Sequence, residues 1–182
     1  MKCRKLFKNP YSILVIGLAI LVIFYCITCY KDYLHVQKER EKGNGVRLAH
    51  SLLVVFEGHS HKCYKDNRGK IAIGHGFTDK KPQSCLTTEH DSSMRLWEDI
   101  IDTSNFIDQY VFIDITSQRR AGLITFIFNI GRQGFLNSKA LVEINNENWE
   151  NARLIMLEWK VKTKKYRKGL AKRRQIEADL ML

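Results

Sequence analysis

The chain has no charged side chain between residues 11 and 30. The residues before this stretch carry several basic side chains and no acidic one: Lys2, Arg4, Lys5 and Lys8. A helix of this length spans ~30 Å, which is the hydrocarbon thickness of a bilayer. The pattern therefore predicts a basic cytoplasmic tail at residues 1–10 and a transmembrane signal anchor at residues 11–30.

A cleavage site is also lacking, because residues 30–33 are bulky or polar where a signal peptidase needs small residues. This absence favours an uncleaved signal anchor over a removed signal peptide. Basic residues stand on both sides of the apolar stretch, so charge alone does not set its orientation. Residues 31–45 are polar and end at Gly43-Asn44-Gly45, which predicts a linker whose first part can be helical.

Nucleic-acid-binding signatures are missing as well: we find no zinc-finger spacing, RNA-binding aromatic motif or clear helix-turn-helix pattern. The formal net charge of +11 still indicates polyanionic surroundings, such as nucleic acid, anionic lipid or bacterial wall polymer. Nucleic acid rests on charge alone, and we expect no such partner. Residues 46–182 are long enough for one domain with a real core.

Two carboxylates, Glu57 and Asp66, flank a glycine-punctuated stretch. Glu57 closes an apolar run of helical spacing, so we expect it in the last helical turn with Gly58 just past it. The helix dipole and partial desolvation there both favour a protonated carboxyl, whereas Asp66 lies in the polar turn 66–69 and should stay ionised. Cleavage of a glycosidic bond needs such a pair, although most Glu and Asp residues at this spacing are merely solvated.

Three sets of residues then occur in a fixed order along residues 45–182. The first is Glu57-Gly58, Tyr64-Lys65-Asp66, Gly69 and Ile73-Gly74-His75-Gly76. The second is Gln118-Arg119-Arg120-Ala121 followed by Phe126-Ile127-Phe128-Asn129-Ile130-Gly131. The third is Gly169-Leu170-Ala171-Lys172-Arg173-Arg174 with Glu177. Together they resemble the active-site, central-helix and C-terminal signatures of phage-type lysozymes, the endolysins of glycoside hydrolase family 24.

The resemblance implies an α+β, mainly α, lysozyme-like fold, with a small β-hairpin lobe and a helical lobe at residues 46–182 behind one transmembrane helix. It implies a muramidase that cleaves the β-1,4 bond between N-acetylmuramic acid and N-acetylglucosamine in peptidoglycan, for phage or prophage host lysis. By the same resemblance, Glu57 takes the general-acid position and Asp66 that of the second carboxylate. No cofactor and no metal are implied.

Two positions depart from the family pattern. Ala72 stands where the family usually has a threonine that helps to hold the attacking water, and Phe77 replaces a common histidine. Loss of a positioning group can cost a few kcal/mol of transition-state stabilisation. The alternative function is therefore a weakened or transglycosylating lysozyme-fold protein that acts mainly in peptidoglycan binding at the membrane. A basic nucleic-acid-binding membrane protein is a third alternative that charge alone supports.

The expected substrate determines the expected location, because a wall hydrolase must face the periplasm. We therefore expect a monomeric, single-pass protein of the bacterial inner membrane with a periplasmic catalytic domain. Some endolysins of this family carry a signal-anchor-release segment rich in Gly, Ala and polar residues. Residues 11–30 are instead dominated by Ile, Leu, Val and Phe, so leaving the bilayer should be costly. We expect retention at the membrane, with release into the periplasm as the alternative.

The five cysteines divide by compartment. Cys3 should be cytoplasmic and reduced, and Cys26 and Cys29 share a helix face near the outer end of the span. Cys63 and Cys85 lie in the periplasmic domain, where a disulfide is permitted. Three arrangements remain open: a Cys63–Cys85 bridge, a bond from Cys63 to an anchor cysteine, and cysteines that are all reduced.

His59, His61 and Cys63 alternate, so on an extended strand they would share one face, which is a conceivable zinc arrangement. No fourth ligand stands at a recognised spacing, and we favour a polar rim beside a substrate groove.

The remaining pattern predicts a hairpin at residues 66–76 followed by helices. The expected helices cover residues 87–101, 106–112, 118–129 and 138–145, and one more contains Trp149 to Trp159. The third is apolar nearly all round, which marks a buried central helix. Residues 160–174 hold nine basic residues and no acid, which is more often a solvated face than a binding patch. Arg173 and Arg174 could pair with Glu177 or turn toward Glu57.

Overall fold

The computed structural model describes residues 10–66, 69–78, 85–159 and 167–182. These residues are mainly helical and contain one sheet of two antiparallel strands. The chain divides into two compact units, Met1–Arg40 and Glu41–Leu182. Residues 1–9 of the expected tail at residues 1–10, and residues 160–166 of the basic run, lie outside the described residues.

Helix α1 (Pro10–Glu57) contains the expected anchor. It is long and apolar enough to cross a membrane, and it is the one such helix among the described residues. Its large apolar side chains from Val15 to Tyr30 are mostly exposed, as they would be if they contacted lipid. The Met1–Arg40 unit thus has the composition and length of a membrane span.

The sequence predicted a linker at residues 31–45 that ends at Gly45, but helix α1 includes all of these residues. It continues through Gly43-Asn44-Gly45 to Glu57, so residues 31–45 are helical throughout. Gly45 has a packing role: a Cβ added there would lie 2.9 Å from the Arg120 Cβ and 2.9 Å from the Ser117 carbonyl oxygen. The glycine allows close approach between α1 and a neighbouring helix, which outweighs its low helix propensity.

The hairpin consists of β1 (Ser60–Lys65) and β2 (Ile71–Gly74). The second strand lies within the predicted bounds of 66–76, but the first strand lies before them. Tyr64 pairs with Ala72, and the strands are joined by a turn in which Asp66 N–H donates to the Lys70 carbonyl at 2.8 Å. The segment after the hairpin returns beside β1, since Cys63 N–H donates to the Cys85 carbonyl at 3.1 Å.

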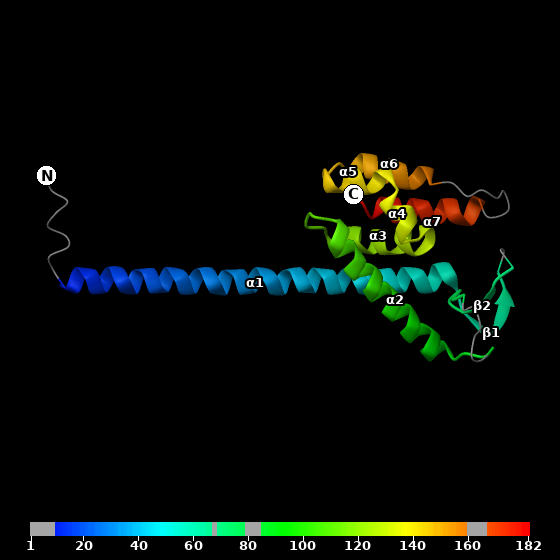
Figure 1. The fold of residues 1–182 in the computed structure, drawn as a ribbon, viewed down its shortest axis with the longest axis horizontal. Coiled ribbons are helices and arrows are strands. Elements are labelled where there is room, and N and C mark those ends of the chain that lie inside the picture. The colour runs from blue at the N-terminus through cyan, green and yellow to red at the C-terminus, as the bar shows by residue number, and fades with distance from the viewer. Residues whose placement is uncertain (1–9, 67–68, 79–84, 160–166) are drawn as a thin grey trace. The chain divides into compact units, whose positions relative to one another are not determined.

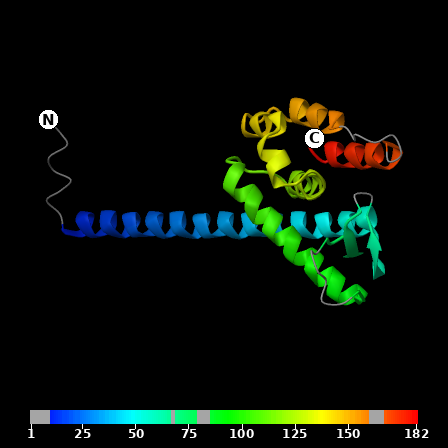
Figure 2. The same ribbon diagram turned by 45° about the vertical axis from the view of Figure 1, so that its right-hand side comes forward.

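Helix α2 (Glu89–Tyr110) begins at Thr88, whose hydroxyl accepts from the Asp91 N–H at 3.0 Å. The cap was expected, but the break expected after Ile101 was not found: helix continues through the residues between the two predicted segments. Thr103 and Ser104 are buried there, and Ser104 accepts from the Arg120 guanidinium through both its hydroxyl and its carbonyl. Figure 2 shows α2 as one continuous helix, and Arg120 from another helix supplies the hydrogen-bond donor for the buried Ser104.

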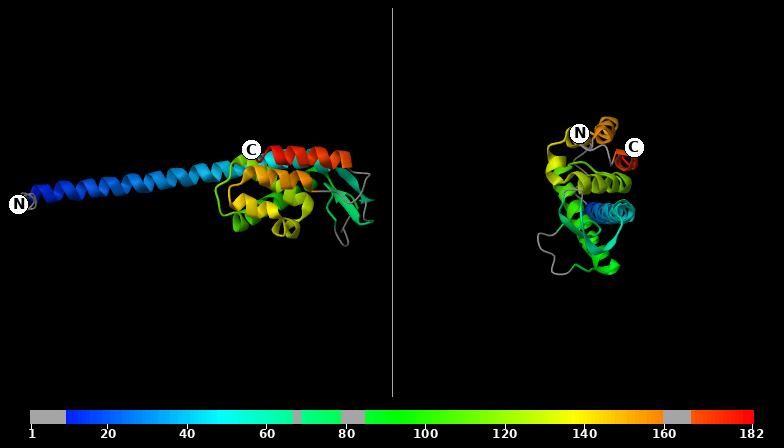
Figure 3. Two further views of the ribbon diagram at one scale, coloured as in Figure 1. Left: turned by 90° about the horizontal axis from the view of Figure 1, so that it is seen from above. Right: turned by 90° about the vertical axis from the view of Figure 1, so that its right-hand side faces the viewer.

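Helix α3 (Ser117–Ile130) is the predicted central helix. It is buried without interruption from Arg120 to Ile127 and contacts α2 and α7 (Figure 1). The described residues after α3 form four further helices: α4 (Arg132–Leu136), which the sequence did not predict, α5 (Lys139–Asn145), α6 (Trp149–Glu158) and α7 (Arg167–Asp179). Helix α6 packs against α5 and α7 (Figure 3).

An ion-pair cluster joins the second half of α1 to α2 and α3. Asp108 lies 2.5 Å from Lys42 Nζ and 2.8 Å from Arg120 Nη1. Burial raises the pKa of Asp108, but hydrogen bonds and charges of these two cations outweigh it, and the pKa is lowered overall. The cluster holds the part of α1 that leads to Glu57 against the helical lobe.

Candidate active site

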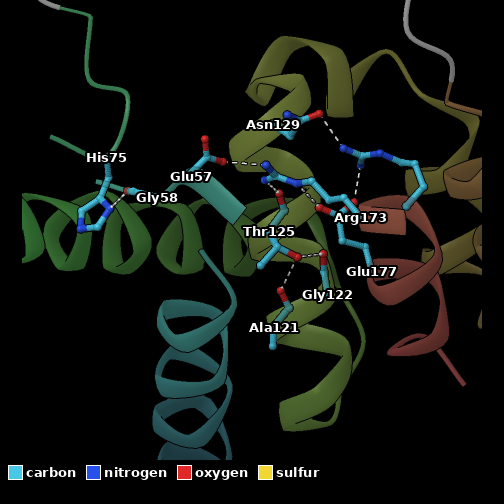
Figure 4. A network of polar contacts seen from close by, with 10 residues as sticks. Glu57, Gly58, His75, Ala121, Gly122, Thr125, Asn129, Arg173 and Glu177 are labelled. Carbon is cyan, nitrogen blue, oxygen red and sulfur yellow. Dashed lines mark hydrogen bonds and ion pairs between the residues drawn. The ribbon is translucent and has the colours of Figure 1, made fainter. Parts of the chain in front are cut away.

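Glu57 is the last residue of α1, as predicted, and Gly58 follows in the left-handed region at φ +63°. The Glu57 side chain is 22% exposed. Its Oε1 atom accepts a hydrogen bond of 2.6 Å from Arg173 Nη1, and Figure 4 shows the carboxylate turned toward that guanidinium. The end of α1 thus presents a carboxylate with one oxygen engaged by an arginine.

Arg173 has three acceptors. Besides Glu57, its Nε donates to Glu177 Oε1 at 2.8 Å and its Nη2 donates to the Thr125 carbonyl at 2.9 Å. The guanidinium also lies 4.9 Å from the centre of the Phe56 ring. The sequence left open whether this arginine pairs with Glu177 or with Glu57, and the structure shows that it does both. A planar fork of donors fixes all three acceptors at once.

A second arginine completes the buried network. Arg174 donates to Glu177 Oε2 through Nη1, and to Asn129 Oδ1 at 2.5 Å through Nη2. Burial raises the pKa of Glu177, whose side chain is fully buried, although both arginines act in the opposite direction. Burial likewise lowers the pKa of Arg174 to about 10. The expectation of a solvated basic face is therefore wrong for Arg173 and Arg174, while Lys168 and Lys172 on the same helix are exposed.

Asp66 follows β1 and opens the turn of the hairpin. Its Oδ1 accepts from the Lys70 N–H at 2.8 Å, and its carbonyl accepts from the Gly69 N–H at 2.9 Å. Partial burial raises the pKa of Tyr64, which is still 41% exposed, and the charges of Glu57 and Asp66 raise it further. The fold thus brings the two predicted carboxylates within electrostatic reach of one phenol, from the end of a helix and the end of a strand.

Gly76 keeps the space beside Glu57 open. A Cβ at this position would lie 3.8 Å from the Tyr64 hydroxyl and 3.9 Å from Glu57 Oε2. The residue has φ +86°, a conformation that favours glycine. Arg173 Nη1 contacts Oε1 of Glu57 and leaves Oε2 free of this contact. Oε2 and the Tyr64 hydroxyl therefore border the same spot at Gly76, which no side chain of residue 76 fills.

His75 connects the end of the hairpin to Gly58 and to helix α2. It is buried, its Nδ1 contacts the Gly58 carbonyl, and its backbone N–H donates to Ser92 Oγ at 3.0 Å. A donor is needed opposite a carbonyl, so Nδ1 carries the proton. His75 was part of the sequence signature, but its partner Ser92 was missed, as was Thr125, because single polar residues inside helices give no such signal.

Both departures from the family pattern are buried. Ala72 is 1% exposed, and Phe77 is 7% exposed beneath the Arg95 guanidinium at 4.3 Å from the ring centre. Phe77 also lines an open pocket of about 380 Å³, whose walls are Gly76, Phe77, Thr78, Arg95, Asp99, Thr103, Ile127, Phe128, Gly131 and Arg132. Gly76 lines this pocket and also borders the spot beside Glu57.

The cysteine alternatives are settled for the described residues. Cys63 and Cys85 form a disulfide with a Cα–Cα distance of 4.9 Å, while Cys26 and Cys29 are free and exposed. We refer to the Cys63–Cys85 bond as the hairpin disulfide. Because the Cys63 sulfur is bonded, it is not free for the zinc arrangement with His59 and His61 considered above.

The His59 and His61 rings lie edge to face with centres 4.5 Å apart, and His59 also approaches His75 at 5.2 Å. That these rings form a polar rim beside a substrate groove stays a prediction. No group of three potential metal ligands is found in residues 10–66, 69–78, 85–159 and 167–182.

A carboxylate at the end of a helix, a second one after a strand of a small hairpin and a buried central helix are the arrangement expected of a glycoside hydrolase of the lysozyme type. The model of the phage lysozyme family matches residues 54–177, and the chain belongs to that family. It is a muramidase of the endolysin class that serves host lysis, so the predicted family, fold class and activity are confirmed.

Relatives include the SAR-endolysin of bacteriophage PS119, 32% identical over 128 residues that cover 70% of this chain and 77% of the relative. The SAR-endolysin of Enterobacteria phage PA-2 is 32% identical over 148 residues, 77% of this chain and 90% of that one. These names and helix α1 both indicate membrane anchoring.

Solved structures agree. A mutant of P22 lysozyme has a TM-score of 0.62 and 30% identity, covering 76% of this chain and 94% of that chain. An endolysin from Escherichia coli O157:H7 phage FAHEc1 has a TM-score of 0.66 and 26% identity, covering 75% and 91%. The muramidase domain of SpmX from Asticcacaulis excentricus has a TM-score of 0.64 at 26% identity, covering 76% and 94%.

Proposed function

We propose that Glu57 and Asp66 are the catalytic carboxylates with which this muramidase cleaves the β-1,4 bond between N-acetylmuramic acid and N-acetylglucosamine in peptidoglycan. The observation that carries the proposal is that the two carboxylate oxygens of Glu57 have different surroundings. Arg173 donates a hydrogen bond to Oε1, while Oε2 borders the open spot at Gly76. An oxygen that faces open space next to a pocket can reach a substrate.

In the proposed reaction, Glu57 gives a proton from Oε2 to the leaving glycosidic oxygen as the bond to C1 breaks. Asp66 takes a proton from a water molecule whose oxygen forms the new bond to C1. Arg173 keeps the Glu57 carboxyl in one orientation, because its other donors are fixed by Glu177 and the Thr125 carbonyl. Positioning of this kind contributes to the rate without a chemical role.

The pocket beside Gly76 is a place for part of the glycan. Its volume of about 380 Å³ is within the usual range for ligand sites, which is roughly 300–1,000 Å³. Its lining combines aromatic rings, Phe77 and Phe128, with the polar groups of Arg95 and Asp99. Sugars need both, because their ring faces are apolar and their edges carry hydroxyl and amide groups.

A clearing assay on purified cell walls tests the assignment with Glu57→Gln and Asp66→Asn, each of which keeps the shape of the side chain. Both variants should lose at least about 100-fold in rate, since proton transfer contributes roughly 10²–10⁴-fold. Glu158→Gln is the matched control, because Glu158 is an exposed glutamate at the end of α6. Full activity of Glu57→Gln would show that the assignment is wrong.

We further propose that the protein is a single-pass monomer of the inner membrane, with residues 46–182 in the periplasm and with retention favoured over release. The bulky apolar side chains of α1 support retention. Fractionation before and after a membrane uncoupler tests it, and a mostly soluble pool would favour release instead. Cross-linking of intact membranes tests the monomer, which predicts no dimer band.

Ala72 favours one second candidate, a weakened or transglycosylating enzyme that acts mainly by binding the wall. The methyl group of Ala72 is almost fully buried, and no hydroxyl projects from this position. Wall binding by the inactive Glu57→Gln variant, measured by sedimentation with purified walls, would support a binding role; a wild-type enzyme with ordinary hydrolytic turnover would remove the need for it.

A further inference from the structure

Tyr64 lies across the hairpin from the residue that lacks the expected hydroxyl. We propose that the Tyr64 hydroxyl positions the attacking water in this enzyme, together with Asp66, and so supplies the hydrogen-bonding group that Ala72 cannot. The inference rests on the proposed catalytic roles of Glu57 and Asp66.

The register of the hairpin places Tyr64 and Ala72 on the same face. They are directly paired across β1 and β2. Side chains of directly paired residues in an antiparallel sheet project to the same side, with Cβ atoms about 4.5–5.5 Å apart. A hydroxyl on residue 72 and the ring of Tyr64 would therefore serve the same face. The small methyl of Ala72 leaves this face to the phenol.

The hydroxyl of Tyr64 is close to the oxygen of Glu57 that faces the substrate side. Both are within van der Waals distance of the Cβ position at Gly76, at 3.8 Å and 3.9 Å. Gly76 also lines the pocket, so the spot and the pocket share this residue. The phenol thus reaches the place where a glycosidic bond would meet Glu57.

The phenol is also suited to bind a water molecule. Tyr64 feels the negative charges of both Glu57 and Asp66, and these charges, after burial, raise its pKa above the usual value near 10. The hydroxyl therefore stays protonated at any pH at which the carboxylates function. It can accept one hydrogen bond from a water molecule and donate another, while the Asp66 carboxylate accepts the proton that the water gives up.

Tyr64 makes no covalent bond in this scheme. The water oxygen bonds to C1, its proton passes to Asp66, and the glycosidic electron pair leaves with the oxygen that Glu57 protonates. The phenol limits the directions in which the water can lie. Loss of such a group should lower kcat and leave KM nearly unchanged, because the sugar itself is bound elsewhere.

The test measures kcat and KM of the full chain in detergent on purified peptidoglycan, by release of reducing ends. Tyr64→Phe removes the hydroxyl and keeps the ring, and we expect kcat to fall about 10- to 100-fold with KM within about twofold. Tyr110→Phe is the matched control, because Tyr110 on α2 is a tyrosine of similar exposure that lies outside the proposed site, and it should behave as wild type.

Rescue separates a positioning role from a structural one. In the Tyr64→Phe background, Ala72→Thr should restore kcat at least about fivefold, whereas Ala72→Val, which has the shape of threonine without a hydroxyl, should not. Equal effects of threonine and valine would overturn the inference. Because residue 72 is buried, near-ultraviolet circular dichroism checks that both double variants fold. If they do not fold, the kcat of Tyr64→Phe and the titration below test the role of Tyr64.

A titration gives a readout that does not depend on turnover. The difference in absorbance at 295 nm between wild type and Tyr64→Phe reports ionisation of the Tyr64 phenol. Glu57→Gln should lower that pKa, because it removes a nearby negative charge. An unchanged pKa would overturn the placement of the phenol.

The outcomes distinguish this inference from the proposed function. If Glu57→Gln is inactive and Tyr64→Phe keeps kcat within about twofold of wild type, only the role of Tyr64 is wrong. If Glu57→Gln is fully active, the proposed catalytic roles are wrong and the role of Tyr64 falls with them.

Discussion

Replacement of Arg173 by methionine removes the guanidinium on which the carboxylate network depends and keeps an apolar chain of similar length. Three acceptors lose a donor: Glu57, Glu177 and the Thr125 carbonyl, at distances of 2.6, 2.8 and 2.9 Å in the native protein. Glu57 is partly exposed and can be rehydrated. Glu177 is fully buried and cannot.

The expected destabilisation is about 3–5 kcal/mol, because removal of one partner from a buried ion pair leaves an uncompensated charge. Arg174 still donates to Glu177 Oε2, which keeps the figure from being larger. Small domains have a free energy of unfolding of roughly 5–15 kcal/mol, so the variant should fold but melt at a much lower temperature. Arg173→Lys should lose less, because an ammonium group can still reach one or two of the acceptors.

Tryptophan fluorescence in urea measures the effect on the full chain in detergent. All three tryptophans, Trp97, Trp149 and Trp159, lie in the Glu41–Leu182 unit, so the signal reports this unit and not the anchor. Lys172→Met removes a charge from an exposed neighbour on α7 and should change stability by less than about 0.5 kcal/mol. If Arg173→Met unfolds at the same urea concentration as this control, the network does not stabilise the fold.

Four further changes test other parts of the structure. Gly74→Ala should cost about 2–5 kcal/mol in thermal unfolding, since its Cβ would lie 2.2 Å from Ser92 Oγ at φ +63°, whereas Gly69→Ala, at φ +76° with open space among the described residues, should cost about 1–2 kcal/mol. Asp108 has a lowered pKa and is 39% exposed, so Asp108→Asn should cost no more than about 1 kcal/mol. This cost should be full above pH ~4, the unfolded pKa, and vanish as pH falls through the folded pKa; a constant cost from pH 7 to pH 2 would contradict it. Reduction of the hairpin disulfide, which closes a separation of 22 residues, should lower stability by about 3 kcal/mol, and non-reducing peptide mass mapping should find this bond.

The sequence was informative where local chemistry decides the structure. Gly58 and Gly69 have a positive φ at the end of α1 and in the turn of the hairpin, where the sequence predicted a helix end and a turn. The caps at Thr88 and Thr116 and the apolar α3 follow from equally local signals, although only the first cap was predicted.

Long-range contacts explain what the sequence could not supply. The Glu57–Arg173 pair joins residues 116 positions apart, and no local pattern selects it over the alternatives. Gly45 looked like a linker end because its close contact with Arg120 is not visible in sequence. Similarly, the sequence predicted two segments where α2 is one helix. The hydrogen bond from Arg120 to the buried Ser104 comes from another helix and is not visible in sequence. Tertiary partners overrode local propensity in each case.

Digestion of purified peptidoglycan in water enriched in oxygen-18, followed by mass spectrometry of the products, tests the central claim most directly. Wild type should place one oxygen-18 at the new reducing end of N-acetylmuramic acid, and Glu57→Gln should give no labelled product above background. Unlabelled anhydro-muropeptides from wild type would indicate transglycosylation in place of hydrolysis. Labelled product from Glu57→Gln at the wild-type rate would contradict the claim that Glu57 is the general acid.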